Sequence, residues 1–208
     1  MAGAWREGWL SGAFERRSPH FDARPEGTSV DLLVLHYISL PPGVFGTGDP
    51  ERLFLGTLDA DARPEYAPLR GLRVSSHFLI ERTGRVSQFV SVHDRAWHAG
   101  LSNFRGRNAC NDFSVGVELE GCGDRPFEDA QYAALEALVQ DLRRELPLRF
   151  VTGHEHIAPE RKADPGPFFD WERVRRFLPE GMETAIRPED CCREMLAERM
   201  RSLAAGRG

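Results

Sequence analysis

Two histidines in different settings are the first residues of this sequence whose types and positions could do chemistry. His36 ends the apolar run 32–35 and is followed by a turn, where a single histidine is more often a hydrogen-bonded structural residue than a metal ligand. His154 lies in the segment 153–167, which has three prolines and two glycines among its fifteen residues. A segment stiffened in this way holds its side chains in fixed directions, as metal binding or catalysis requires.

Two histidines and one carboxylate from separate segments are typical of a catalytic zinc site. They give zinc three protein ligands and leave the fourth coordination position open for water, whereas structural zinc sites are closed by four ligands. The residues offer His36 and His154 together with either Asp164 or Glu155. Composition alone does not choose between the two carboxylates.

Apolar periodicity predicts the elements that must position these residues. Strands are expected at 30–37, 74–81, 85–92, 113–119 and 149–152, the second and third forming a hairpin around Gly84. A helical stripe over 129–146 predicts a helix that Pro147 ends, and Asp170 is placed to cap another. Strands separated by a long helix predict an α/β protein, a single domain in which helices flank a central mixed sheet.

Three segments lie outside this frame. The first 28 residues mix glycine, proline and charge, which indicates an irregular arm wrapped on the surface. Residues 43–72 read as a long loop with one short helix, capped by Asp49 and with Pro50 at its first position. We place the domain at 1–178 and assign 179–208 to a C-terminal extension with an amphipathic helix.

Four separate motifs resemble one enzyme family. They are His36–Gly43, Arg95–Gly100, Cys110–Gly121 and Gly153–Pro167. In this order and at this spacing they resemble the zinc-dependent N-acetylmuramoyl-L-alanine amidases of the type 2 family, and most closely the cytoplasmic branch that recycles 1,6-anhydromuramyl fragments of the cell wall. The resemblance runs from about residue 7 to residue 178, and it implies the central mixed sheet flanked by helices that the periodicity predicts.

The resemblance implies a role for each matching residue. His36, His154 and Asp164 bind one Zn²⁺ per chain, Glu118 acts as general base, and Lys162 lies near the scissile carbonyl. The implied reaction is hydrolysis of the amide between the lactyl group of (1,6-anhydro-)N-acetylmuramic acid and L-alanine of the stem peptide. Zinc makes hydroxide available near neutral pH, and a carboxylate outside its ligand shell can carry the proton.

Each assignment has an alternative. Glu120 lies on the same strand face as Glu118, so periodicity does not separate the two, and Lys162 could be a surface lysine. Glu155 and His156 are expected to be exposed loop residues. Two positions depart from the family pattern: Tyr37 stands where the recycling branch commonly has asparagine, and Ser76 where some other amidases place a catalytic tyrosine.

Substrate contacts are expected from four residues. Arg73 and Arg161 offer guanidinium groups to the carboxylates of a stem peptide, which arginine binds with two hydrogen bonds. Trp97 offers a flat apolar face to a sugar or peptide, although tryptophan is more often a core residue. His98 either lines the cleft or packs beside an aromatic ring. His77, inside an apolar strand, is expected to be structural.

Composition excludes several classes of protein. The 208 residues carry 27 Lys+Arg against 32 Asp+Glu, a net charge of −5, which disfavours general nucleic-acid binding. No apolar segment is long enough to cross a membrane. The charged start and the four cysteines without a C-x-x-C pair favour the cytoplasm, and a monomer is expected. The remaining alternatives are a non-catalytic peptidoglycan-binding module and an exported amidase acting on intact peptidoglycan.

Overall fold

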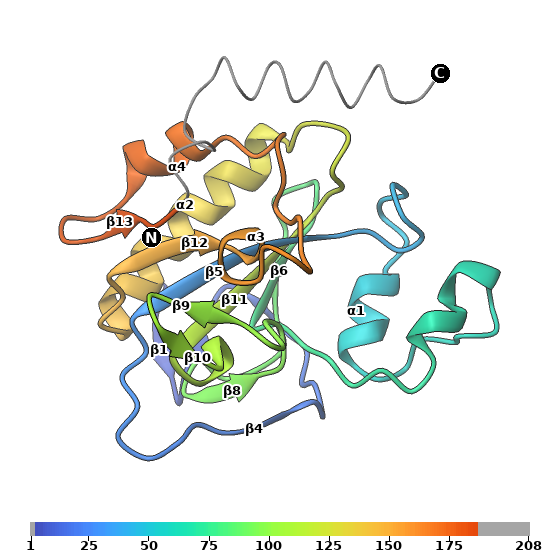
Figure 1. Cartoon of the computed structure of the whole chain (residues 1–208), viewed down its shortest axis with the longest axis horizontal. Coiled ribbons are helices and arrows are strands. Elements are labelled where there is room, and N and C mark those ends of the chain that lie inside the picture. The colour runs from blue at the N-terminus through green and yellow to red at the C-terminus, as the bar shows by residue number, and fades with distance from the viewer. Residues whose placement is uncertain (1–2, 187–208) are drawn as a thin grey trace.

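The computed structural model describes residues 3–186, which are built around a seven-stranded sheet (Figure 1). Its strand order is β13-β12-β5-β11-β6-β7-β3. The strands are β3 (Phe14–Glu15), β5 (Leu32–Ile38), β6 (Phe78–Ile80), β7 (Val86–Gln88), β11 (Ser114–Glu120), β12 (Phe150–Gly153) and β13 (Glu183–Thr184). All neighbours run parallel except β6 and β7, which pair antiparallel. This is the predicted mixed sheet, with the predicted hairpin inside it.

The two central strands, β5 and β11, present different residues to their two faces. Leu33 and Leu35 belong to the main core with alternate residues of β11, and Leu32 and Val34 belong to a second cluster on the opposite face. The main core is closed by α2 (Asp129–Glu145) and α4 (Trp171–Phe177). Figure 1 shows α2 behind the strands, with α3 (His154–Ile157), β9 (Asn103–Phe104) and β10 (Arg107–Asn108) in front. Because side chains alternate along a strand, His36 lies on the front face.

The bounds of α2 and the start of α4 agree with those that the sequence indicates. At the start of α2, the Glu128 carboxylate accepts from the Gln131 backbone N–H, and the Gln131 side chain accepts from that of Glu128. The Asp170 carboxylate accepts from the Arg173 backbone N–H, which caps α4 as predicted. The helix α2 ends at Glu145 with Leu146 as its C-cap residue, because Pro147 cannot continue a helix.

The N-terminal arm is more regular than predicted. Phe14–Glu15 is an edge strand of the central sheet, β1 (Trp5–Arg6) pairs with β2 (Trp9–Leu10), and β4 (Phe21–Ala23) pairs with β8 (Asp94–Ala96). The prediction of an irregular arm was therefore wrong. Strands of two or three residues are too short to show a period of two, so their pairing depends on the strands that they meet.

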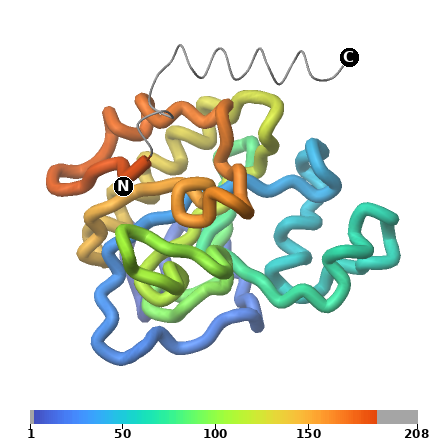
Figure 2. The backbone as a smooth tube through the Cα atoms, in the orientation of Figure 1, coloured from blue at the N-terminus to red at the C-terminus, as the bar shows by residue number. Residues whose placement is uncertain are grey.

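The segment 43–72 stands out on one side of the sheet (Figure 2) and contains more helix than predicted. The short helix α1 (Asp49–Phe54) is present, but its N-cap is Gly48 rather than Asp49. The Asp49 carboxylate instead accepts from Arg52 and from the Tyr66 hydroxyl, at 2.5 and 2.6 Å. A second, 3₁₀ helix over Pro64–Leu69 was missed because its two prolines favoured a loop.

Near the C-terminus, β13 pairs with β12, so the sheet continues past residue 178. The predicted extension over 179–208 falls mostly on residues 187–208, which lie outside the described residues, and both it and the boundary stay predictions. Within residues 3–186 no helix combines the length and the apolar character that a bilayer crossing demands. Cys110 and Cys122 are buried free thiols.

Candidate metal centre

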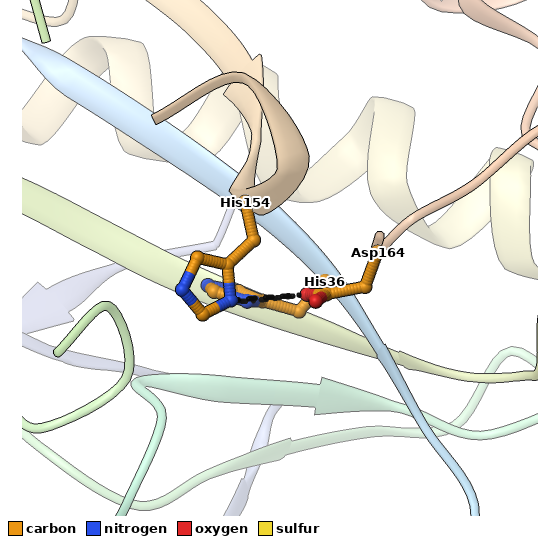
Figure 3. Close-up of side chains that lie close together, drawn as sticks. All are labelled: His36, His154 and Asp164. Carbon is orange, nitrogen blue, oxygen red and sulfur yellow. Dashed lines mark hydrogen bonds and ion pairs between the residues drawn. The ribbon is translucent and has the colours of Figure 1, made fainter. Parts of the chain in front are cut away.

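His36, His154 and Asp164 meet at the carboxyl ends of two adjacent parallel strands. His36 lies near the end of β5, and His154 follows directly after β12, whose Gly153 is paired with Leu35. Asp164 comes from the stiff loop beyond α3, where its carbonyl accepts from the Glu155 backbone N–H at 2.8 Å. One ligand atom from each of the three side chains lies within 4.8 Å of the other two. Figure 3 shows the three side chains converging.

The two imidazoles turn the same nitrogen toward Asp164. The Nδ1 atoms of His36 and His154 lie 2.9 and 3.2 Å from Asp164 Oδ2, and 3.0 Å from each other. Two imidazole nitrogens and a carboxylate oxygen are the donor set of a three-ligand zinc site, which leaves a fourth position for water or substrate. The donor set therefore fits zinc.

Burial sets the charge of these groups. Burial and the neighbouring His154 lower the pKa of His36 to about 4, although Asp164 acts in the opposite direction. Burial raises the pKa of Asp164, but hydrogen bonding to His154 and His36 outweighs it and holds that pKa below its ordinary value. At neutral pH His36 is therefore uncharged and Asp164 ionised, which are the protonation states that metal ligands need.

The structure separates the two candidate carboxylates of this loop. Asp164 reaches both histidines, whereas Glu155 lies in α3 with its carboxylate oxygen 3.8 Å from His156 Nε2. The Glu155 and His156 side chains are 4 % and 3 % exposed, so the prediction that both are exposed loop residues was wrong. The segment that follows His154 forms a helical turn, and the His156 ring lies 5.7 Å from the ring of Trp171.

Glu118 lies beside the metal ligands on the front face of the sheet. It is paired in register with His36 on β5 and with Leu79 on β6. Its side chain is buried, and its Oε2 has no hydrogen-bond partner among the described residues. Burial, together with the charge of Asp164, raises the pKa of Glu118 well above the ordinary value, and Lys162 acts against this rise. A buried carboxylate with a free oxygen and a raised pKa suits proton transfer.

Glu120 shares the strand face of Glu118 but has a different environment. Its two carboxylate oxygens accept from the backbone N–H groups of Gly46 and Arg82, at 2.5 and 3.2 Å. Glu120 therefore holds the start of the segment 43–72 against β11. The geometry favours Glu118 as the carboxylate available for chemistry.

The structure divides the remaining predicted site residues into two groups. Lys162 is exposed, and its charge acts on the pKa values of both His36 and Glu118, which places it near the site. The guanidinium of Arg73 lies over the Trp97 ring, 5.4 Å from its centroid. By contrast, His98 and Arg161 form hydrogen bonds behind the metal ligands, to His36 Nε2 and to the Ala99 carbonyl.

Sequence reasoning missed three residues near the site. His20 stacks on Trp97 with ring centroids 6.2 Å apart, and Asp22 accepts from the Trp97 indole N–H at 3.0 Å. Asn111 accepts from two backbone N–H groups beside the metal centre. His20 and Asp22 lie far along the chain from Trp97, and only the motif Cys110–Gly121 contained a signal that could have drawn attention to Asn111.

His77 is a structural histidine, as predicted. Its Nδ1 accepts from the Gly116 backbone N–H at 3.0 Å, so Nε2 carries the proton and donates to the Asp94 carbonyl at 3.1 Å. Burial, assisted by the charge of Arg24, lowers the pKa of His77 to about 3.

Comparison with known proteins gives consistent matches. The family model described as N-acetylmuramoyl-L-alanine amidase matches residues 26–167. The chain is 49 % identical over 170 residues to the 1,6-anhydro-N-acetylmuramyl-L-alanine amidase AmpD of Haemophilus influenzae, covering 80 % of this chain and 92 % of that protein.

Solved structures give the same picture. A crystal structure of a selenomethionine derivative of AmpD is similar with a TM-score of 0.81 and 48 % identity, covering 85 % of this chain and 99 % of that one. The amidase AmiD from Escherichia coli, solved with the substrate anhydro-N-acetylmuramic acid-L-Ala-D-γ-Glu-L-Lys, is similar with a TM-score of 0.53 and 31 % identity, covering 84 % of this chain and 65 % of that one.

Proposed function

This chain belongs to the N-acetylmuramoyl-L-alanine amidase family, and we propose that it performs the family's hydrolysis with one zinc ion held by His36, His154 and Asp164. Its substrate is an anhydromuramyl peptide released in recycling of the cell wall. The bond broken is the amide between the lactyl group of anhydro-N-acetylmuramic acid and L-alanine of the stem peptide. The observation that carries the metal proposal is the convergence of two imidazole Nδ1 atoms and a carboxylate oxygen beside the unpartnered carboxylate of Glu118.

The chain's own residues supply binding and proton transfer. When bound, zinc supplies a Lewis acid that polarises the amide carbonyl and lowers the pKa of water toward about 7. Glu118 accepts the proton of the attacking water at its free Oε2 and passes it to the departing alanine nitrogen. The ammonium of Lys162 stabilises the negative charge that develops on the carbonyl oxygen.

Substrate positioning is assigned to groups around the metal centre. We propose that Trp97 offers its face to the sugar or peptide and that Arg73, stacked on it, binds a stem-peptide carboxylate. His98 and Arg161 were expected to join them, and their hydrogen bonds behind the ligands favour a supporting position instead. We further propose that the protein acts as a monomer in the cytoplasm, in line with the buried free thiols of Cys110 and Cys122.

One experiment tests the zinc requirement and the substrate together. The purified full chain is analysed for zinc content and then incubated with anhydromuramyl-tripeptide and, separately, with intact sacculi, while release of free peptide is followed. We expect one zinc per chain and cleavage of the anhydromuramyl-tripeptide. Zinc-loaded protein that cleaves neither substrate would overturn the proposed activity, and cleavage of sacculi alone would indicate wall remodelling. Full activity in a metal-free preparation would overturn the zinc requirement.

A further inference from the structure

Both candidate metal-binding histidines are held from behind by two consecutive residues. The Nε2 atom of His36 lies 3.0 Å from His98 Nδ1, and the Nε2 atom of His154 lies 3.0 Å from the Ala99 carbonyl oxygen. We call the dipeptide His98–Ala99 the ligand support. A single short stretch of chain therefore contacts the rear nitrogen of each imidazole, while both Nδ1 atoms face Asp164.

These rear contacts determine which nitrogen is free for a metal. A carbonyl oxygen only accepts, so His154 donates from Nε2–H to Ala99 and keeps the lone pair on Nδ1. For His36 to present its Nδ1 lone pair as well, Nε2–H must donate to His98 Nδ1. The neutral His98 ring then donates from Nε2–H to the Ser114 hydroxyl, which lies 3.2 Å away. The hydrogen bond at the rear nitrogen of a ligand histidine fixes its tautomer and its direction.

Two side chains that are not metal ligands fix the support. The Asn111 side-chain oxygen accepts from the backbone N–H groups of both His98 and Ala99, at 3.2 and 2.8 Å. Arg161 donates from Nη2 to the carbonyls of Ala99 and Leu101, at 2.8 and 2.7 Å. The Ala99 oxygen therefore receives both Arg161 and His154. Asn111 therefore binds the backbone N–H groups of the support, and Arg161 binds one of its carbonyls.

The packing of strand β11 against the His98 ring requires glycine at position 116. A Cβ atom built on Gly116 would lie 2.5 Å from His98 Cγ, far inside van der Waals contact. Glycine at this position of β11 therefore leaves the space that the imidazole occupies where it reaches both His36 and Ser114. Ser114 and Gly116 lie on the same strand face as Glu118, so one face of β11 both contacts the His98 ring and presents the catalytic carboxylate.

We propose that Asn111 and Arg161 are positioning residues for the metal centre, which act through the ligand support to hold both histidines in the tautomer that binds zinc. This inference rests on the proposed zinc site. Neither residue touches substrate or metal in this scheme. Removing either side chain loosens the ligand support. The hydrogen bonds that the support makes with Nε2 of His36 and Nε2 of His154 are then weakened.

The test measures zinc affinity in the full-length protein by competition with a chromophoric chelator. Asn111→Leu and Arg161→Met should each weaken zinc binding by about 10- to 100-fold, the range typical of outer hydrogen-bond partners of metal ligands. Asn111→Asp keeps the acceptor oxygen and should restore most of the affinity. Asn108→Leu, a change of the same type at an exposed asparagine that accepts from the Asn103 side chain, is the matched control and should stay within about twofold.

A double-mutant cycle distinguishes this role from general destabilisation. Because Asn111 and Arg161 act on the same dipeptide, the loss of zinc affinity in the double variant should be clearly smaller than the product of the two single losses. In ¹⁵N-resolved NMR spectra of the zinc-loaded protein, the Nε2–H signals of His36 and His154 should be present in the wild type and weakened in both single variants. If Asn111→Leu does not fold, the exposed Arg161→Met carries the test.

Failure of this proposal and failure of the proposed function look different. If the wild type binds no zinc, the zinc site itself is wrong. If the wild type binds zinc and cleaves substrate while Asn111→Leu or Arg161→Met binds zinc equally tightly, only the positioning role is overturned. Fully multiplicative losses in the double variant would likewise overturn it.

Discussion

Replacing Glu118 by glutamine separates proton transfer from metal binding. The carboxylate is buried beside His36, and its Oε2 has no partner among the described residues, so the substitution removes a proton acceptor and leaves the ligands in place. A positioned general base contributes about 10²- to 10⁴-fold in rate, or about 3–5 kcal/mol of activation free energy. We therefore expect Glu118→Gln to retain one zinc per chain and to lose kcat by that factor, with little change in KM.

The same substitution makes a second prediction, about stability in the metal-free protein. Burial raises the folded-state pKa of Glu118 above the unfolded value of 4.5, so between these two pKa values the folded state holds a proton that the unfolded state has released. Stability then falls as pH rises through this window, by up to about 1.4 kcal/mol per pH unit for one group. Glutamine does not ionise, so the melting temperature of Glu118→Gln should rise relative to the wild type from pH 4.5 upward.

Glu120→Gln is the matched control, because it lies two residues away on the same strand face. Its carboxylate holds the Gly46 and Arg82 backbone N–H groups rather than facing the site, so we expect a loss of about 1–2 kcal/mol in stability and a change in kcat below about tenfold. Activity is followed by release of peptide from anhydromuramyl-tripeptide, zinc by elemental analysis, and stability by thermal melts across pH. A zinc-loaded Glu118→Gln with more than about a tenth of wild-type kcat would refute the general-base assignment. A stability difference that does not change with pH would refute the raised pKa.

Three further variants test the metal ligands, the substrate contacts and the core. His154→Ala removes one of the three ligand atoms, so zinc content and hydrolysis should be lost together, and added zinc in excess should restore part of each. Trp97→Ala removes the aromatic face on which Arg73 lies and should raise KM about tenfold with a smaller effect on kcat, as steady-state kinetics would show. Leu142→Ala empties a fully buried position of α2 and should lower the free energy of unfolding by about 2–5 kcal/mol in denaturant titrations, while the zinc affinity of the folded protein stays within a fewfold of the wild type.

The long helix and strands could be predicted because the side chains that they bury recur at regular spacing in the sequence. The apolar stripe of α2 and the alternating apolar residues of β11 are buried in the same core, and this burial is visible in the local sequence pattern. The two-residue strands of the N-terminal arm have no such pattern in the sequence, since their register depends on distant partners such as Gln88 on β7. The cap of α1 was misplaced by one residue because Arg52 and Tyr66 engage the Asp49 carboxylate.

The metal ligands could be predicted only in part from the residues themselves. His36 and His154 stood out by their settings, but the choice between Asp164 and Glu155 depends on how the loop after α3 folds back, with the Glu155 N–H bonded to the Asp164 carbonyl. The distinction between Glu118 and Glu120 depends on Gly46 and Arg82, which approach from other segments. No periodicity within β11 contains that information.

The alternation of β11 explains why stability and chemistry can be altered separately in this protein. Val115, Val117 and Leu119 lie in the core that α2 closes, so substitutions there change the free energy of unfolding. Ser114, Gly116 and Glu118 point to the opposite face, toward His98 and the metal ligands. The buried carboxylate of Glu118 on that face makes the metal-free fold less stable as pH rises. The strand therefore stabilises the domain through one face and holds on the other a buried carboxylate whose ionisation lowers the free energy of unfolding. For this reason Glu118→Gln is expected to lose activity and also to lose the pH-dependent decrease in stability.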